Sequence, residues 1–339
     1  MRSDRRIGSA LIVRCLGVVL AAALTVLART PAPAQGPSVD ELVSGIVALK
    51  TAINSDALTA EGLGREREGS AIVIDANGLV LTIGYLMVEA RSAEVTTNDG
   101  HTVPADVVGY DPETGFGLLR ALGPLKVRPM TFGKSADLKA GDPVLVAAAG
   151  GPANAAPASV VARREFAGGW EYLLDDAIFT IPPHPAWSGA ALINREGKLV
   201  GVGSLIVADA TGEHGIAGNM FVPIDLLPPI LGDLIANGRA GGPARPWLGM
   251  TTEEKGGSLR VSQVTPGGPA QKAGIARGDV IIGVGGETSK GMADFYRKVW
   301  ARGAAGTSVP LDVQKDNTTR HVDVKSMNRL DSLKLKQTF

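Results

Sequence analysis

Residues 184–192 read HPAWSGAAL and place Ser188 in a tight turn directly before an apolar strand. A turn at Glu196-Gly197 and a second apolar run from Leu199 to Leu205 follow, so this part of the chain is expected to form a β-hairpin. A serine hydroxyl in such a turn is a candidate nucleophile, but it needs a neighbouring base to take its proton. The function therefore depends on the fold around this turn and on the residue beside Ser188.

Short apolar runs separated by glycine-containing turns extend through most of the chain. The pairs Asn77-Gly78 and Asp99-Gly100 favour the positive φ angles of tight hairpin turns. The 339 residues include 44 glycines and 21 prolines and are 45% hydrophobic but only 4% aromatic, which suits many short strands better than a helical bundle. We therefore predict a mostly β protein of sandwich or barrel type, with helical segments at 39–50, 222–237, 269–276 and 290–302.

Changes in composition divide the chain, whose length suffices for two or three domains. The predicted parts are a signal peptide (1–34), an N-terminal segment (35–60), a first folded domain (61–238), a linker rich in glycine and proline (239–246), a second domain (247–329) and a tail (330–339).

The first 34 residues have the features of an export signal. A basic start with three arginines, an apolar run of 14 residues (Cys15–Ala28) and the small residues Ala32-Pro33-Ala34 predict cleavage before Gln35. The mature protein would then be periplasmic or secreted, and the alternative is an uncleaved inner-membrane anchor. Cys15 is the only cysteine, so the mature chain would have neither a disulfide nor a thiolate metal site.

Charge and residue spacing argue against several classes of ligand. The formal net charge is zero, and removing the five arginines and one aspartate of residues 1–34 leaves 29 basic and 33 acidic residues, a net charge of −4. This acidic balance is wrong for nucleic-acid binding. No group of His, Asp and Glu has metal-site spacing, and the glycine-rich stretch 147–151 does not lie at a phosphate-binding strand–helix junction. We therefore expect no metal and no cofactor.

The second domain carries the strongest motif. Residues 264–275 read VTPGGPAQKAGI, Gly278-Asp279-Val280-Ile281 follows, and this sequence resembles a bacterial PDZ domain. The resemblance implies binding of peptide C-termini as an added strand, with backbone N–H groups of a glycine-containing loop meeting the terminal carboxylate. Leu248, Gly249 and Met250 match that loop. The side-chain pocket is then expected between strand 248–252 and helix 290–302.

The first domain resembles the protease domain of the HtrA/Deg family, secreted trypsin-like enzymes with C-terminal PDZ domains. The matching stretches occur in the family's order and, with the PDZ motif, extend over most of residues 61–330. They are 69–82, 95–119, 197–202, 221–224 and the start of the second domain at 247–249. The resemblance implies a trypsin-like double β-barrel followed by one PDZ domain.

The residues that this family uses for proton transfer are replaced. The family has a His shortly after the first hairpin and an Asp at the start of a later strand, and Tyr85 and Gly115 stand at these positions here. Tyrosine has an unperturbed pKa near 10 and accepts protons poorly at neutral pH, and glycine has no side chain to orient a base. The resemblance also implies an oxyanion hole formed by the N–H groups of residues 186 and 188, and Ala186 and Trp187 are expected to disturb it.

Four histidines remain as alternative bases: His101, His184, His214 and His321. His184 lies four residues before Ser188 and would reach it only if the loop folds back; otherwise we expect an exposed loop histidine. His101 follows a hairpin turn, His214 lies in a polar loop and His321 lies in the second domain. None of the three is predicted to act as the base. Ser188 is then interpreted as a turn serine whose hydroxyl caps the local backbone.

These observations favour a binding protein over an enzyme. We expect an exported, catalytically inactive HtrA-like protein that binds peptide or unfolded-protein C-termini as a scaffold, a chaperone-like holder or a partner of an active protease. Two alternatives stay open: an active serine endopeptidase in which Ser188 uses a non-standard base, and a structural or oligomerisation protein of the cell envelope. An oligomer is compatible with the sequence, but the trimer that the family resemblance implies is in doubt, because residues 35–84 contain no aromatic residue.

Overall fold

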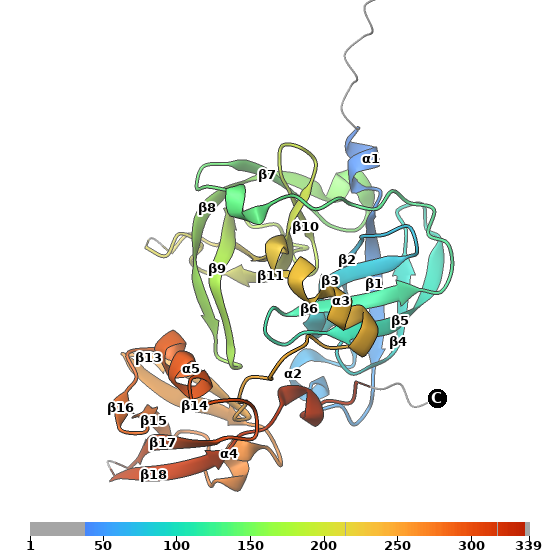
Figure 1. Cartoon of the computed structure of the whole chain (residues 1–339). Helices are drawn as coiled ribbons and strands as arrows, with labels where there is room; N and C mark the ends of the chain where they lie inside the picture. Colours follow the sequence, from blue (N-terminus) through green and yellow to red (C-terminus); the bar gives the residue numbers. More distant parts are fainter. Residues whose placement is uncertain (1–37, 214, 317, 336–339) are drawn as a thin grey trace, which may run out of the picture. The chain divides into compact units, whose positions relative to one another are not determined.

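The computed structural model describes residues 38–213, 215–316 and 318–335. Strands dominate these residues and form two closed barrels followed by an open sheet (Figure 1). The predicted mostly β architecture, a double β-barrel followed by a smaller β domain, is therefore confirmed. The predicted signal peptide lies outside the described residues, and none of the helices within them is long and apolar enough to cross a membrane.

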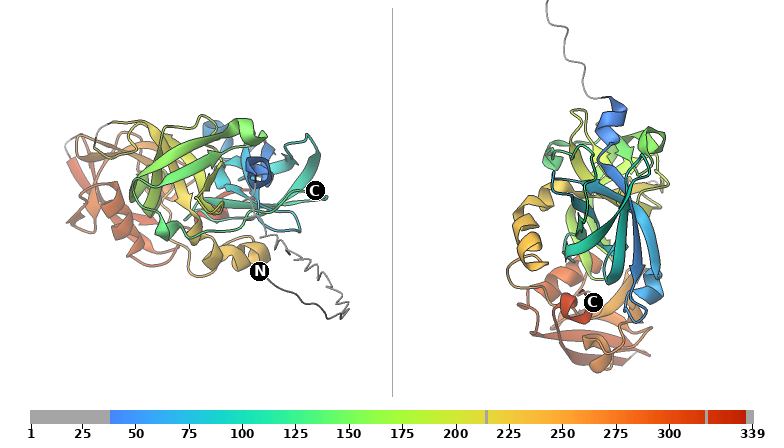
Figure 2. Two further views of the ribbon diagram at one scale, coloured as in Figure 1. Left: turned by 90° about the horizontal axis from the view of Figure 1, so that it is seen from above. Right: turned by 90° about the vertical axis from the view of Figure 1, so that its right-hand side faces the viewer.

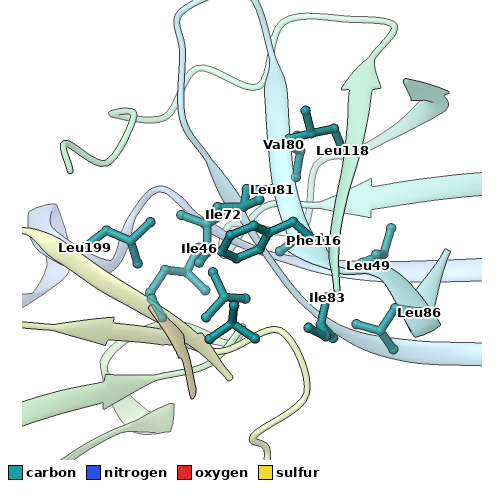
Figure 3. Close-up of a cluster of buried hydrophobic side chains, with 14 of the residues drawn as sticks. Ile46, Leu49, Ile72, Val80, Leu81, Ile83, Leu86, Phe116, Leu118 and Leu199 are labelled. Carbon is teal, nitrogen blue, oxygen red and sulfur yellow. The ribbon is translucent and has the colours of Figure 1, made fainter. Parts of the chain in front are cut away.

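The first barrel closes on itself in the order β1-β2-β3-β6-β5-β4, so its strands leave no unpaired edge. Its interior is filled by aliphatic side chains around the fully buried Phe116, with Ile46 and Leu81 among its neighbours (Figure 3). The strands are β1 (Ile46–Ile53), β2 (Glu66–Val73), β3 (Leu79–Ile83), β4 (Ala90–Thr96), β5 (Thr102–Tyr110) and β6 (Phe116–Ala121).

The second barrel closes in the order β10-β11-β12-β9-β8-β7. Its strands are β7 (Pro143–Ala147), β8 (Ala155–Gly168), β9 (Tyr172–Ile181), β10 (Ala191–Ile193), β11 (Leu199–Val207) and β12 (Gly218–Pro223). β8 and β9 are its longest strands and pair from Ser159 opposite Ile181 to Gly168 opposite Tyr172. This long hairpin turns at residues 169–171.

The helices of the described residues between 38 and 238 are short. They are the α-helices α1 (Val39–Val43), α2 (Ala60–Leu63) and α3 (Pro228–Asn237), and the 3-10 helices η1 (Gly84–Leu86), η2 (Ser135–Asp137), η3 (Gly151–Asn154) and η4 (Ile224–Leu226). α3 packs beside β5 on the outside of the first barrel (Figure 2).

Two helices predicted in the first domain and its N-terminal segment differ from the structure, and the helix predicted over 269–276 ends already at Lys272. The helix predicted over 39–50 ends at Val43, because from Ile46 onward the chain pairs with both β2 and β4 and buries Ile46, Val47 and Leu49 in the barrel. The helix predicted over 222–237 begins only at Pro228, since residues 218–223 form β12. Proline suits the first turn of a helix because its φ is already helical and its missing N–H would have no partner there.

The C-terminal domain is an open sheet in the order β13-β14-β15-β17-β18, with β16 paired to β15. The elements are β13 (Met250–Lys255), β14 (Ser258–Val264), α4 (Pro269–Lys272), β15 (Val280–Val284), β16 (Glu287–Thr288), α5 (Met292–Trp300), β17 (Ser308–Lys315), β18 (Thr318–Lys325) and η5 (Arg329–Ser332). α5 buries Phe295, Tyr296 and Val299 against the sheet, as its apolar spacing predicts. β13 is an edge strand within this sheet, so one side of its backbone is left for another partner.

Candidate functional site

The turn at Ser188 joins β9 to β10 and is held against the first barrel. The backbone N–H of Ser70 donates to the carbonyl of Ser188 (2.8 Å). Gly189 has φ +72°, and a Cβ at this position would lie 1.9 Å from the carbonyl oxygen of Ser70. Only glycine fits so close to the neighbouring strand in this conformation. The turn predicted from residues 184–192 is therefore present, with Ser188 half-buried beside the junction of the two barrels.

Tyr85 lies directly beside Ser188. It is carried by η1, which follows β3, and its hydroxyl oxygen is 2.8 Å from Ser188 Oγ. The same hydroxyl donates to the carbonyl of Ser204 at 2.8 Å. A carbonyl can only accept, so the single phenolic proton is directed to Ser204, and the Ser188 hydroxyl donates to the phenolic oxygen. The Ser188 hydroxyl thus pairs with Tyr85 and not with the local backbone.

The chemistry of Tyr85 opposes its use as a base. Burial raises the pKa of Tyr85 to about 12, with the hydrogen bond to Ser188 acting in the opposite direction. At pH 7 roughly one tyrosine in 10⁵ would be ionised with such a pKa. The hydrogen-bond geometry of a nucleophile and its base is present, but a neutral phenol is a poor proton acceptor.

Within the described residues, no carboxylate is hydrogen-bonded to Tyr85. Gly115 lies just before β6, and a Cβ there would meet the hydroxyl of Tyr172 at 3.3 Å. The buried Asp111 accepts from the backbone N–H and the hydroxyl of Thr114 (2.8 and 2.6 Å). Glu113 forms an ion pair with Arg245 at 3.0 Å. Both carboxylates near residue 115 are therefore engaged elsewhere.

The backbone of the turn is also engaged. The N–H of Ala186, one of the two donors expected to form an oxyanion hole, donates to Nδ1 of His184 at 3.2 Å. His184 is only 7% exposed, so the expectation of an exposed loop histidine is wrong. Its backbone N–H donates to Asn219 Oδ1 (2.6 Å), which draws the residue inward. Burial lowers the pKa of His184, while hydrogen bonds with the backbone of Asn154 and Ala186 oppose that shift. His184 therefore binds the turn and not the Ser188 hydroxyl.

The remaining histidines lie elsewhere. His101 follows the turn at 99–100, and His321 on β18 pairs with Asp312 in the C-terminal domain. His214 lies outside the described residues. Within the part of the chain that the structure describes, no His, Cys, Asp and Glu cluster of three or more could hold a metal ion.

A second site lies at the start of the C-terminal domain, where three consecutive backbone N–H groups converge on a carboxylate. Leu248, Gly249 and Met250 donate to Glu171 at 2.8, 2.7 and 3.1 Å. Gly249 has φ +75°, which turns the successive N–H groups toward one point. The loop is itself held in place, since Ala270 N–H donates to the carbonyl of Leu248 at 2.7 Å. The sequence predicted these three donors but gave no sign of Glu171.

The two elements expected to flank a peptide groove beside this loop are β13 and α5. The backbone N–H of Thr252 on β13 donates to the carbonyl of Gly169 at 2.8 Å. The hydroxyl of Tyr296 on α5 donates to the carbonyl of Gly168 at 2.8 Å and accepts from the N–H of Glu171 at 3.2 Å. The turn of the β8–β9 hairpin therefore meets the loop, the strand and the helix together. Sequence reasoning missed this contact because no motif joins residues 168–171 to residues 248–296.

Family comparisons agree with this architecture. Residues 69–202 match a trypsin-like peptidase domain, and residues 246–326 match a PDZ domain. The structure resembles that of the HtrA-type protease AlgW with decapeptide, with a TM-score of 0.51, 21% identity and coverage of 86% of this chain and 99% of that one. The two domain matches and the fold together define a trypsin-like peptidase domain followed by a C-terminal PDZ domain, the arrangement in which the chain is similar to HtrA-type proteases.

Curated serine proteases are similar in sequence to most of this chain. The chain is 30% identical to serine protease PepD of Mycobacterium tuberculosis over 272 residues, which are 73% of this chain and 57% of that protein. It is 29% identical over 280 residues, 77% of this chain and 57% of the relative, to a protein of Pseudomonas fluorescens named probable periplasmic serine endoprotease DegP-like. The chain spans little more than half the length of these relatives.

Proposed function

We propose that this protein is an exported, catalytically inactive HtrA-like protein that binds the C-termini of peptides or unfolded proteins through its PDZ domain. The observation that carries the proposal is the loop Leu248–Met250, whose three N–H groups hold a carboxylate at hydrogen-bond distance. A peptide C-terminus offers the same chemical group, and its backbone would extend the sheet at the edge of β13.

Three features of the Ser188 turn support the loss of catalysis. Tyr85 replaces the base and stays protonated, Gly115 supplies no orienting carboxylate, and the N–H of Ala186 is bound to His184. Removing general-base assistance costs about 10²–10⁴-fold in rate, and losing the whole triad costs on the order of 10⁶. Binding without cleavage suits a scaffold, a chaperone-like holder or a partner of an active protease.

The export proposal rests on residues 1–34, with cleavage before Gln35, and on relatives whose names call them periplasmic. An uncleaved inner-membrane anchor is the alternative. We further propose the parts 35–60, 61–238, 239–246, 247–329 and 330–339 as N-terminal segment, trypsin-like domain, linker, PDZ domain and tail.

One observation favours a second function, an active serine endopeptidase. Ser188 Oγ lies 2.8 Å from Tyr85, the distance expected between a nucleophile and its base. A tyrosinate would be needed to take the proton, and burial opposes its formation. The inactive state is therefore the stronger proposal.

The binding function is tested with a fluorescein-labelled decapeptide ending in leucine, prepared as the free acid and as the C-terminal amide. Fluorescence anisotropy with the purified mature protein should show tighter binding of the free acid, because the amide lacks the charge that three N–H donors stabilise. Equal binding of the two peptides would remove the argument for carboxylate capture.

A further inference from the structure

We propose that the tip of the β8–β9 hairpin, residues 165–175, is an intramolecular ligand of the PDZ groove, with the Glu171 carboxylate seated where the terminal carboxylate of a peptide would bind. Peptides then bind only by displacing the hairpin tip. This inference rests on the proposed peptide-binding function and assigns its regulation to a segment of the trypsin-like domain.

The carboxylate site is the first element of the competition. Both carboxylate oxygens of Glu171 are used: one accepts from Leu248, and the other accepts from Gly249 and Met250. A peptide carboxylate requires the same three donors, so the two carboxylates cannot be bound at once. Glu171 is only 8% exposed, so its carboxylate is largely shielded from solvent where it meets the loop.

The backbone of the groove is occupied as well. One edge of β13 is paired with β14. A Cβ on Gly169 would lie 2.1 Å from the carbonyl oxygen of Thr252, so the hairpin tip runs directly against β13. The Thr252 N–H that a bound peptide strand would use donates instead to Gly169 (2.8 Å). Tyr296 closes the other side of the groove with its two hydrogen bonds to Gly168 and Glu171.

Apolar and charged contacts hold the rest of the tip. The side chain of Leu173 is buried within the apolar cluster of the PDZ domain, which also contains Leu248 and Phe295. Arg297 on α5 forms ion pairs with Glu165 and Asp175, one on each strand of the hairpin. The tip therefore supplies a carboxylate, a strand segment and an apolar side chain, which are the three elements of a C-terminal peptide ligand.

The backbone conformation of Glu171 also supports docking of the hairpin tip in the PDZ groove. It has φ +58°, a left-handed backbone conformation that is uncommon for residues other than Gly, Asn and Asp. Such strain persists only where surrounding contacts determine it, and here those contacts come from the PDZ loop. A peptide must replace all of these contacts. The apparent dissociation constant of the peptide is therefore the intrinsic constant divided by the fraction of molecules in which the tip is undocked.

The experiment compares the mature wild-type protein with Glu171→Ala, Glu171→Gln and the matched control Glu196→Ala, which removes an exposed glutamate from another hairpin turn. Anisotropy with the leucine-terminated decapeptide measures affinity. Hydrogen exchange of residues 165–175, with and without saturating peptide, reports whether the tip is docked. Circular dichroism verifies folding, and the near-isosteric Glu171→Gln decides the result if Glu171→Ala does not fold.

Glu171→Ala should bind the free-acid peptide about tenfold more tightly or better, since the competing charge-assisted hydrogen bonds are lost. Glu196→Ala should bind as the wild type does, and the free-acid peptide should accelerate exchange of the wild-type tip. Equal affinity of all four proteins, with the tip still protected at saturation, overturns the inference while leaving the proposed function intact. If no variant binds the free-acid peptide, the proposed function fails and the inference fails with it.

Discussion

The Ser188 turn and the Leu248–Met250 loop are two places where a glycine-containing backbone can present N–H groups to a negatively charged oxygen. At the turn, the N–H of Ala186 is satisfied by an imidazole nitrogen of His184, and the serine beside it faces a neutral phenol. At the loop, three N–H groups meet a carboxylate. Under the proposed function, the turn no longer performs chemistry, whereas the loop still binds a carboxylate.

The largest expected effect concerns the turn. Mature protein should show no endopeptidase activity on casein and no labelling of Ser188 by a fluorophosphonate probe. Its turnover is expected to be on the order of 10⁶-fold below that of an enzyme with an intact triad. Ser188→Ala should change neither result, because an unassisted hydroxyl is a weak nucleophile. Trypsin in the same assay is the positive control. Strong labelling that disappears in Ser188→Ala would show that the turn is still catalytic and would break the comparison.

The next effect concerns the charge of Glu171. Burial raises its pKa from 4.5 to about 7, and the loop N–H groups and the charge of Arg329 oppose the shift without cancelling it. The folded state therefore binds the proton more tightly than the unfolded state does. Its stabilising contribution is fully present below pH 4.5 and is lost as pH rises to about 7.

Glu171→Gln provides the reference for this effect, because Gln does not titrate. Between pH 4.5 and pH 8 the wild type should lose up to about 3 kcal/mol of unfolding free energy relative to the variant. Urea unfolding of both proteins at pH 5 and pH 8 measures the difference. A wild type that gains stability relative to Glu171→Gln at pH 8 would mean that the N–H donors outweigh the burial of the charge.

These two sites also show which features can be predicted from the sequence and which depend on the fold. The turn at Ser188, the replacements Tyr85 and Gly115, and the donors of the loop follow from local motifs. In the structure Tyr85 lies beside Ser188, and the three loop N–H groups converge on one carboxylate. The partner of the loop does not follow, because Glu171 reaches it through folding and not through any local pattern. His184 was misjudged for the same reason: its burial depends on Asn219, which is far away in the sequence.

The third effect concerns the geometry of the loop. At Gly249 (φ +75°) a Cβ would lie 3.1 Å from Pro269 Cδ and 3.3 Å from the Trp247 ring, whereas at Gly257 (φ +74°) it would meet nothing within 4 Å. Both positions share the backbone strain of a left-handed residue, about 1–2 kcal/mol. Gly249→Val should additionally displace the N–H donors and reduce peptide affinity roughly 10-fold or more, while Gly257→Val should leave affinity unchanged. Similar affinities of the two variants would mean that the loop is not the carboxylate site.

The smallest expected effect concerns Tyr296, whose hydroxyl makes two of the hydrogen bonds that hold the hairpin tip. Tyr296→Phe leaves the ring and the three loop donors in place, so it weakens docking of the tip without removing the carboxylate. The free energy of docking the tip should fall by about 1–2 kcal/mol, and hydrogen exchange of the Thr252 N–H should accelerate accordingly. Tyr172→Phe is the matched control, because its hydroxyl donates to Thr114 within the trypsin-like domain at 2.7 Å. If the two variants accelerate exchange at Thr252 equally, the hydroxyl of Tyr296 stabilises the fold in general and does not hold the tip in the groove. Faster exchange in Tyr296→Phe alone would support the proposal that this hydroxyl holds the hairpin tip against β13.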